Sequence, residues 1–325
     1  METPDGFRCP NPGCGEPARP EDRFCEACGA PLPTRVALIG VQAEATAPQY
    51  APTTWEPAAE PAQGRDHVEL AYPDLAGVSD RGLKRNRNED ALALARLDDH
   101  GALILVVCDG VSSSAEPAAA SQAAADAVLA YLVAAVRDRH PDPEEAMRGA
   151  MSAAQAAVCV VPWQQADGEE APATTVVAAL VFDRSMTIGW VGDSRAYFIG
   201  VMDSWQLSTD DTWAADQIEF GLMGEEEALA DPRAHALTSW VGAEQDGEPV
   251  PSIRSFTSPT SGCILLCSDG LWNYAPSPER MRELLTELPG DASAVDVARG
   301  LTEFARAAVM QRTPRGASIP ASSRC

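Results

Sequence analysis

The chain has 325 residues and a formal net charge of −24, from 24 Lys and Arg against 48 Asp and Glu. This balance argues against a duplex nucleic-acid partner, which needs a basic face, and against an anionic membrane surface. No apolar run approaches the roughly 18–20 residues of a membrane span, and the first residues lack the basic and apolar regions of a signal peptide. We therefore expect a soluble, cytoplasmic protein with one large domain and a small appendage.

Four of the nine cysteines lie close to the start of the sequence: Cys9, Cys14, Cys25 and Cys28. Each pair ends in Cys-Gly, a tight turn in which backbone amides can face thiolate sulfur. Two such turns supply four soft ligands for tetrahedral Zn²⁺, whose binding would fold a segment too small to hold a core. We predict a closed, structural zinc site in residues 1–33, which resembles the zinc ribbons of many bacterial regulatory proteins. A redox dithiol is the competing interpretation, but a βαβ context is absent.

Residues 34–66 are rich in Ala, Pro, Thr, Gln and Glu without helical or alternating periodicity, so we predict a flexible, semi-extended linker. From residue 67 short apolar strands alternate with Ala-rich helices. Helices that come in pairs between runs of strands predict antiparallel sheets covered by helices, in a domain of residues 67–308. The expected elements, in chain order, are strands at 68–78, 91–97 and 103–108, helices at 116–137 and 143–160, strands at 174–182, 187–192 and 195–200, helices at 211–221, 225–230 and 232–240, strands at 252–257 and 263–267, and helices at 278–287 and 292–310.

Four short acidic segments stand beside a glycine or at a strand end. They are Asn88-Glu89-Asp90, Asp109-Gly110, Gly192-Asp193-Ser194 and Asp269-Gly270. An Asp-Gly after a strand puts a carboxylate at the sheet edge, and the glycine lets backbone and ions approach closely. Carboxylate oxygens from several strand ends are what Mg²⁺ or Mn²⁺ require. Any single Asp-Gly is more simply explained as a turn, in which both residue types are common. Four such segments together predict a carboxylate metal site.

Five motifs, together covering about residues 68–308, resemble in order and spacing those of bacterial metal-dependent Ser/Thr protein phosphatases of type 2C (the PPM family). They are Ser79-Asp80-Arg81-Gly82 through Arg85 to Asp90, Val107–Gly110, Thr174-Thr175, Gly192–Tyr197 and Leu266–Leu271. The resemblance implies an α+β fold. Its form is a four-layer α-β-β-α sandwich, with two central antiparallel sheets flanked by helices.

The resemblance also implies a metal centre. Asp109 would bridge two Mg²⁺ or Mn²⁺ ions, with the Gly110 carbonyl on one of them, and Asp269 would be a carboxylate ligand of the other. Asp193 would help to hold a weaker third ion. Two such ions about 3.5–4 Å apart lower the pKa of a bridging water and stabilise in-line displacement at phosphorus. No phosphoenzyme is needed.

Further roles follow from the same resemblance. Glu89 and Asp90 would hold waters bound to the metal. Arg85 would grip the substrate phosphate, a role that suits a bidentate guanidinium, with Arg87 as the weaker rival. Arg195 is expected to make a structural salt bridge. The four histidines show neither pairing nor ligand spacing, so we expect them at the surface or in packing.

Two departures from the family pattern concern the surroundings of the site. After Asp109-Gly110 the family usually continues with Gly-Gly-His, whereas this chain has Val111–Ser114. Protonation of the leaving group by a local histidine is therefore not expected. Residues 208–240 resemble the variable flap beside the active site, in which Asp210, Asp211 and Trp213 would shape substrate choice.

The third departure is the segment 309–325. The family ends with a Gly-x-Asp-Asn motif, whose Asp completes the first metal site, and a Val-rich strand. Here no acidic residue follows Glu303, and the segment reads as disordered. We expect a frameshift or truncation near residue 309, which would leave a sheet edge unpaired. The metal site would be weakened, since losses of outer-shell partners alone lower metal affinity about 10–100-fold.

The function implied by the resemblance is metal-dependent hydrolysis of phosphoserine or phosphothreonine on proteins, with a bacterial Ser/Thr kinase as the counterpart. A pseudophosphatase that binds phosphoproteins or other partners without turnover is the alternative, but Glu89, Asp109 and Asp269 are all intact. An acidic zinc-ribbon adaptor with an inert domain explains the two ends of the chain and not the motifs. The sequence leaves the oligomeric state, the particular substrate and the choice between Mn²⁺ and Mg²⁺ open.

Overall fold

The computed structural model describes residues 67–140, 142–164, 170–201, 203–243 and 250–312, together with Cys14, Ala27, Cys28 and the backbone of 36–40. The predicted zinc ribbon lies outside these residues except for Cys14, Ala27 and Cys28. The predicted linker also lies outside them except for 36–40, as does the segment from 313 onward.

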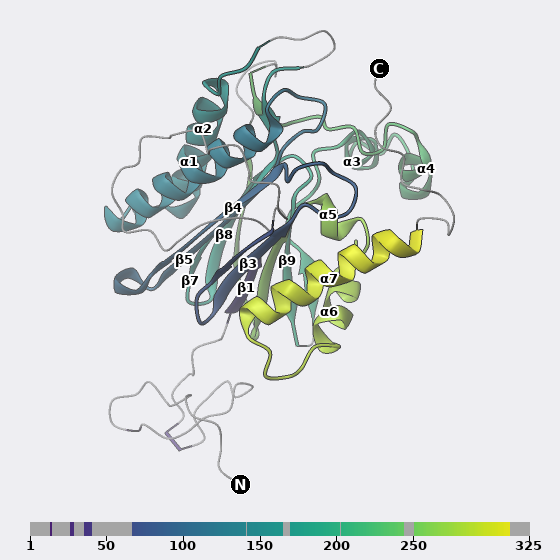
Figure 1. The fold of residues 1–325 in the computed structure, drawn as a ribbon. Coiled ribbons are helices and arrows are strands. Elements are labelled where there is room, and N and C mark those ends of the chain that lie inside the picture. Colours follow the sequence, from purple (N-terminus) through teal and green to yellow (C-terminus); the bar gives the residue numbers. More distant parts are fainter. Residues whose placement is uncertain are drawn as a thin grey trace.

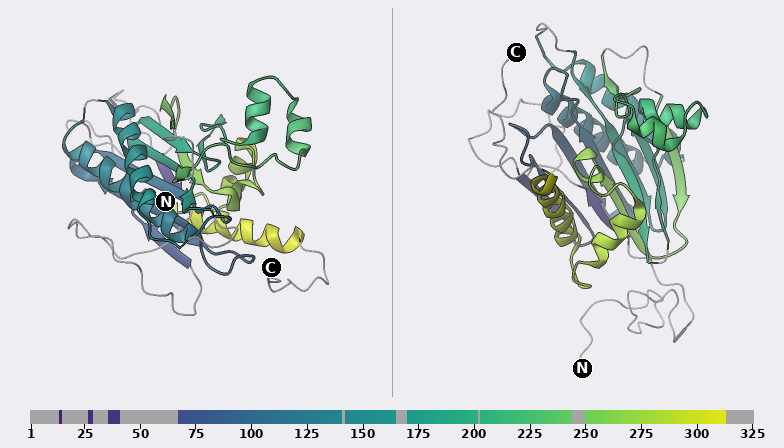
Figure 2. Two further views of the ribbon diagram at one scale, coloured as in Figure 1. Left: turned by 90° about the horizontal axis from the view of Figure 1, so that it is seen from above. Right: turned by 90° about the vertical axis from the view of Figure 1, so that its right-hand side faces the viewer.

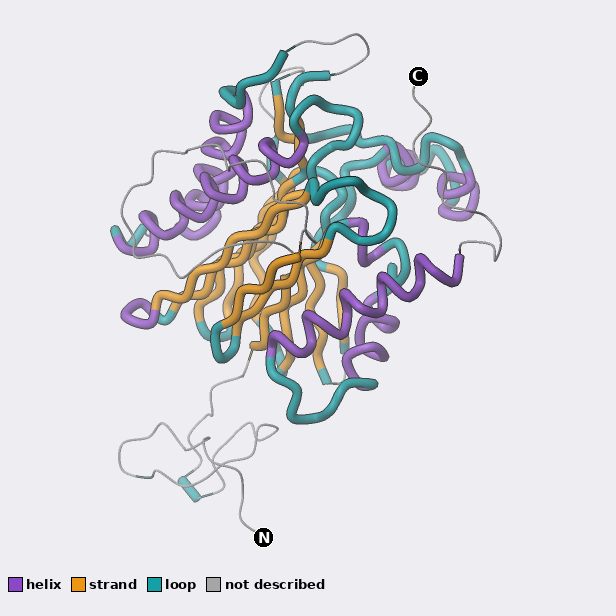
Figure 3. Tube along the Cα trace, viewed as in Figure 1, coloured by secondary structure: helices purple, strands orange, loops and turns teal. Residues whose placement is uncertain are grey.

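The described strands form two large sheets that pack face to face (Figures 1 and 3). The six-stranded sheet has the order β10 (Ser204–Gln206), β9 (Arg195–Gly200), β13 (Gly262–Cys267), β1 (Val36–Gly40), β3 (Leu75–Asp80) and β2 (His67–Ala71). The five-stranded sheet has the order β12 (Ser252–Thr257), β8 (Ser185–Val191), β7 (Val176–Phe182), β5 (Ala102–Asp109) and β4 (Asp90–Leu97). A short ribbon pairs β6 (Ala173–Thr174) with β11 (Val241–Gly242).

The predicted antiparallel pairing holds for every described strand pair that does not include β1. β1 runs parallel to β13 and to β3, so the six-stranded sheet is mixed. The strand also lies within residues predicted as linker, and that prediction was wrong for 36–40. A short apolar run without flanking periodicity carries little local signal, because its strand conformation depends on pairing with residues that are distant in the sequence.

Helices cover the outer face of each sheet (Figure 2). α1 (Pro117–Arg137) and α2 (Pro143–Cys159) lie on the five-stranded sheet, and α6 (Pro278–Thr286) and α7 (Ala294–Arg312) lie on the six-stranded sheet. The shorter helical elements are η1 (Asp98–His100), α5 (Asp269–Trp272), and the pair α3 (Trp213–Glu219) and α4 (Glu225–Ala230), which stands apart from the sheets at the right of Figure 1.

Alternation along the strands gives the sheets two buried faces. In β5, Ile104 and Val106 join the apolar cluster beneath α1 and α2, whereas Leu105 and Val107 join the cluster between the two sheets. Successive side chains of a strand point to opposite faces, so a strand covered on both sides must be apolar throughout. A third apolar cluster lies between the six-stranded sheet and α5–α7.

The helix α1 is long and apolar enough to cross a membrane, with a mean hydropathy of 1.5. The sequence expectation that no run approaches this length was therefore too strict. Its buried side chains, which include Ala120, Ala124, Val128 and Leu132, belong to the cluster on the five-stranded sheet. The apolar character of α1 is accounted for by this packing.

Three local predictions were wrong. The strand expected at 68–78 is a hairpin of β2 and β3, because a turn at Tyr72–Asp74 contains Pro73 and closes with a hydrogen bond from Tyr72 N to Leu75 O. The segment 232–240 forms turns rather than a helix. The Asp231 side chain accepts a hydrogen bond from Arg233 N at 2.8 Å, which favours a turn over a helix. The strand expected at 174–182 is divided at Thr175 into β6 and β7, which belong to different sheets. The other expected elements are present, with small shifts at their ends.

Candidate metal centre

A cavity of about 260 Å³ opens where β3, β5 and β13 end and β4 begins. Its walls come from these strand ends, from the loop after β3, and from α5 and α7. The residues that the sequence singled out and that line this cavity are Arg85, Arg87, Glu89, Asp90, Asp109, Asp269 and Gly270. The structure therefore brings together the acidic segments 88–90, 109–110 and 269–270, which lie far apart in the chain.

Asp90 and Asp109 form the centre of the acidic group. They are cross-strand partners, one at the start of β4 and the other at the end of β5. The charge of Asp90 raises the pKa of the Asp109 carboxyl, an effect that a bound cation would offset.

The backbone of Asp109 is fixed by the two threonines of the predicted Thr174-Thr175 motif. The Asp109 carbonyl oxygen accepts hydrogen bonds from Thr174 Oγ1 at 2.9 Å and from Thr175 N at 2.8 Å, and Asp109 N donates to Thr175 Oγ1 at 3.2 Å. A side chain at Gly110 would collide with the carbonyl oxygens of Pro117 and Glu89, so only glycine fits here. The Thr-Thr motif thus holds the carboxylate strand end in place.

Burial and mutual repulsion raise the pKa of several of these carboxyls. Burial raises the pKa of Asp90 to about 7, with further repulsion from Asp269 and Glu89. The pKa of Asp109 is raised well above its ordinary value by burial and by the charges of Asp90 and Asp269. Burial and the Asp269 charge likewise raise the pKa of Asp193 to about 7. A multivalent cation would offset this repulsion and return the carboxyls to their charged form.

The donor chemistry fits Mg²⁺ or Mn²⁺, which bind carboxylate and carbonyl oxygens. In this conformation, no three Asp, Glu, His or Cys side chains among the described residues converge closely enough to form a ready-made cage. Asp109 and Asp269 would hold the ions, and waters held by Glu89 and Asp90 would complete the coordination, as is usual for Mg²⁺.

Glu89 is held by neighbours on both sides. Ser112 Oγ donates a hydrogen bond of 2.9 Å to Glu89 Oε2, Arg85 Nη1 lies 3.8 Å from the same oxygen, and Arg87 Nε lies 4.0 Å from Oε1. The side chains of Arg85 and Arg87 are 58% and 51% exposed, so both can reach a ligand in the cavity. Both arginines that the sequence proposed for the phosphate therefore stand at its mouth.

Asp269 and Asp193 approach the cavity from the six-stranded sheet. Asp269 begins α5, and its Oδ2 accepts a hydrogen bond of 3.1 Å from Asn273 Nδ2. The carbonyl oxygen of Asp193 accepts a hydrogen bond of 2.9 Å from Trp272 Nε1. Asp193 does not line the cavity, but its charge raises the pKa of Asp109. The third-ion role implied by the resemblance stays a prediction.

Sequence reasoning missed an ion-paired group at one wall of the cavity. Asp80, at the end of β3, accepts hydrogen bonds from Gly82 N and from Arg306 Nη1 of α7, both at 2.9 Å, and His67 Nδ1 lies 2.9 Å from its Oδ2. His67 also lies 3.1 Å from Glu69 Oε1 and is exposed, in agreement with the expected surface position of the histidines. The motif Ser79–Gly82 marked Asp80, but nothing local marked Arg306 as its partner.

Arg195 makes the structural salt bridge predicted from the sequence. Its Nε and Nη2 donate to the two carboxylate oxygens of Asp210 at 2.8 and 2.7 Å, and its guanidinium lies 3.9 Å from the centre of the Trp272 ring. Asp211 Oδ2 accepts a hydrogen bond from Gly192 N at 2.8 Å. Asp210 and Asp211 therefore anchor the base of the flap, and together with Trp213 they lie outside the cavity lining.

We expect Asp210→Ala to destabilise the fold by about 3 kcal/mol, because it leaves the largely buried Arg195 without its carboxylate. The double variant Arg195→Met with Asp210→Leu should regain most of this loss, since it removes the uncompensated charge. Urea unfolding of the three proteins measures both values. A single variant as stable as the wild type would show that the pair does not anchor the flap.

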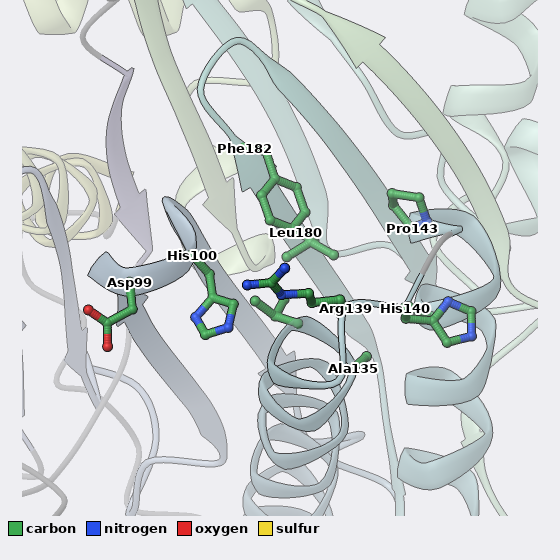
Figure 4. A pocket seen from close by; sticks show the side chains of 10 residues that line it. Asp99, His100, Ala135, Arg139, His140, Pro143, Leu180 and Phe182 are labelled. Atoms are coloured by element: carbon green, nitrogen blue, oxygen red, sulfur yellow. The ribbon is translucent and has the colours of Figure 1, made fainter.

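A second cavity, of about 360 Å³, lies at the other end of the five-stranded sheet (Figure 4). His100, Arg139 and His140 line it, together with Asp99 of η1 and apolar residues that include Phe182. It contains none of the predicted site residues. The two cavities are separated by the length of β4 and β5.

Comparison with known proteins agrees with this geometry. The serine/threonine phosphatase stp of Listeria monocytogenes is 36% identical over 114 residues, which cover 34% of this chain and 43% of the relative. The serine/threonine protein phosphatase PstP of Mycobacterium tuberculosis is 30% identical over 203 residues, covering 60% of this chain and 36% of the relative. The chain therefore spans less than half the length of these curated relatives.

Solved structures show the same fold. A crystal structure of a bacterial serine phosphatase aligns with a TM-score of 0.61 at 24% identity, over 75% of this chain and 92% of that one. The PPM Ser-Thr phosphatase MsPP of Mycobacterium smegmatis, solved with cacodylate, aligns with a TM-score of 0.53 at 25% identity, over 70% of this chain and 90% of that one. A family model described as protein phosphatase 2C matches residues 83–305. The chain belongs to the protein phosphatase 2C family.

Proposed function

We propose that this protein hydrolyses phosphoserine and phosphothreonine on proteins in a metal-dependent reaction. The observation that carries the proposal is the meeting of Asp90, Asp109 and Asp269 at one cavity with two exposed arginines at its mouth. The acidic and the basic groups of the cavity have different ligands. The carboxylates suit divalent cations, and the guanidinium groups suit the phosphate itself.

Divalent ions, when bound, supply an activated water and neutralise charge that develops on the phosphoryl oxygens. The chain's own residues do the rest. Asp109 and Asp269 hold the ions, Glu89 and Asp90 orient waters around them, and Arg85 or Arg87 binds the phosphate. No histidine is present among the described residues that line the cavity, so protonation of the leaving group falls to water.

A phosphothreonine peptide tests the proposal. We expect purified protein to hydrolyse it with Mn²⁺ or Mg²⁺ and to lose all turnover in EDTA. Folded protein that shows no turnover at millimolar Mn²⁺ would leave phosphoprotein binding without turnover as the function. No observation specifically favours that alternative.

A matched pair of variants distinguishes the roles of the two arginines. We expect Arg85→Ala to raise KM for the phosphopeptide about 10-fold or more, because a lost charge-assisted pair is worth about 1.5–3 kcal/mol. Arg87→Ala should raise KM less, and neither change should alter Mn²⁺ affinity beyond a small factor. Steady-state kinetics at saturating Mn²⁺ measure both. The reverse order would assign the phosphate to Arg87.

The finer assignments are also part of this proposal. The three apolar clusters support the layer order α-β-β-α. Cys14 and Cys28 lie in turns, as a structural zinc ribbon formed with Cys9 and Cys25 would require. The buried thiols of the domain suit a reducing, cytoplasmic location, where the substrates would be phosphoproteins made by a bacterial Ser/Thr kinase and the role would be in signalling.

A further inference from the structure

The centre of the six-stranded sheet is completed by a segment that lies outside the domain in the sequence. β1 stands between β13 and β3, and residues 41–66 separate it from β2. Adjacent strands lie about 4.7–4.9 Å apart, so without β1 the facing edges of β3 and β13 would be about 10 Å apart and could not pair. Their backbone N–H and C=O groups would then lack partners inside a covered sheet.

The slot that β1 occupies is enclosed on four sides. β13 pairs with it from Val36↔Gly262 to Gly40↔Leu266, and β3 pairs with it from Leu38↔Leu75 to Gly40↔Gly77. α7 packs across one face of β1, and β5 of the other sheet lies on the opposite face. A strand covered on both faces must be apolar throughout, and the sequence at 36–40 is Val-Ala-Leu-Ile-Gly.

Both walls of the slot lead directly into the candidate metal centre. β3 ends at Asp80, which lines the cavity and binds Arg306 of α7, and β13 is followed by Ser268 and Asp269. Asn88, beside the acidic pair Glu89-Asp90, donates a hydrogen bond to Ser79 Oγ of β3. The width of the slot therefore sets how far the loop with Arg85 and Glu89 lies from Asp269.

We propose that the gap between β3 and β13 is a strand-acceptor site whose ligand is the extended apolar segment 36–40 of this chain. Docking of that segment holds the two metal-binding strand ends at working distance, and its release opens the metal centre. The docking itself is independent of the proposed function. Only its consequence for hydrolysis rests on that function.

A disulfide tests the docking in the full chain. Register partners on neighbouring strands share a face of the sheet, and Ala37 is the partner of the native Cys263 in β13. We expect Ala37→Cys to form a 37–263 disulfide on mild oxidation, which peptide mapping detects. Leu38→Cys, the matched control one position on, is the register partner of Ile264 rather than of a cysteine and should form none. Folded Ala37→Cys protein that cross-links no better than the control would overturn the docking.

The effect on the metal centre is tested with Leu38→Pro, which removes a ladder N–H from a central strand. We expect Mn²⁺ affinity, measured by paramagnetic resonance of free Mn²⁺, to fall about 10-fold, the effect of losing an outer support of a metal site. A synthetic peptide of residues 34–42 should restore it, whereas the same peptide with proline at position 38 should not. Ala58→Pro, outside β1, should leave the affinity unchanged.

The results separate this inference from the proposed function. Unchanged Mn²⁺ affinity in Leu38→Pro, or a loss that the peptide does not restore, would overturn the coupling between slot and metal centre. A protein that cross-links and recovers Mn²⁺ binding but hydrolyses no phosphopeptide would keep the inference and lose the proposed function. A Leu38→Pro protein that hydrolyses the phosphopeptide as fast as the wild type would keep the proposed function and overturn the coupling.

Discussion

Replacement of Asp109 by Asn is expected to lower turnover of a phosphothreonine peptide by more than about 100-fold, the upper end for losses of mere outer support. The reason is that Asp109 ends β5 opposite Asp90 at the start of β4, and lies close enough to Asp269 for the charge of Asp269 to raise the pKa of Asp109. Among the described residues that line the cavity, Asp90 and Asp109 are the only two carboxylates that are cross-strand partners. Steady-state kinetics across a Mn²⁺ titration measure the loss.

The same substitution should stabilise the protein in EDTA. Asn has the shape of Asp without the charge whose burial raises the pKa of Asp109. Activity and metal-free stability are therefore expected to change in opposite directions. Asp126→Asn is the charge-matched control, because Asp126 lies in α1 outside the cavity. It should leave hydrolysis unchanged. An Asp109→Asn protein that loses activity and also unfolds more readily in EDTA would point to misfolding instead.

Sequence alone predicted those site residues whose role is indicated by a short motif. Asp109-Gly110 follows a continuous apolar run, and the structure has β5 ending there, with Gly110 in a position that admits no side chain. Asp269 follows a similar run and begins α5. Arg195 was predicted to make a structural salt bridge and does so with Asp210. In each case the residue type is required by its immediate neighbours in the chain.

The parts that sequence did not predict depend on pairing between distant segments. β1 is a strand because β3 and β13 flank it, and its own five residues are indistinguishable from an apolar patch in a linker. Arg306 lies in a helix that was predicted correctly, but its partner Asp80 is more than 200 positions earlier in the chain. The segment 232–240 has a helical composition, and the Asp231 cap turns the chain instead. Local pattern decides the type of most elements, and tertiary contacts decide these exceptions.

The stability of the metal-free protein is expected to fall as the pH rises from 5.5 to 8. Burial raises the folded-state pKa of Asp90 and Asp193 to about 7 and that of Asp211 to about 6, all above the ordinary value of 3.8. Between these values the unfolded chain has already released its protons while the folded chain holds them. Raising the pH therefore favours the unfolded state, and the penalty is complete above the folded-state pKa. Glu69, whose pKa is lowered to about 2 by Arg299, acts in the opposite direction, but only below this pH range.

Mn²⁺ should reverse this trend, because it binds the carboxylates in the charged form that high pH produces. We expect the Tm in EDTA to drop by about 5–10 °C between pH 5.5 and 8, given that 1 kcal/mol shifts the Tm of a domain of this size by about 2–4 °C. The rise in Tm on adding Mn²⁺ should be larger at pH 8 than at pH 5.5. Asp90→Asn should flatten the profile in EDTA and shrink the Mn²⁺ effect. A metal-free Tm that rises with pH across this range would mean that the carboxylates already carry their charge without a cation. The repulsion between them would then not favour the binding of a cation in the cavity.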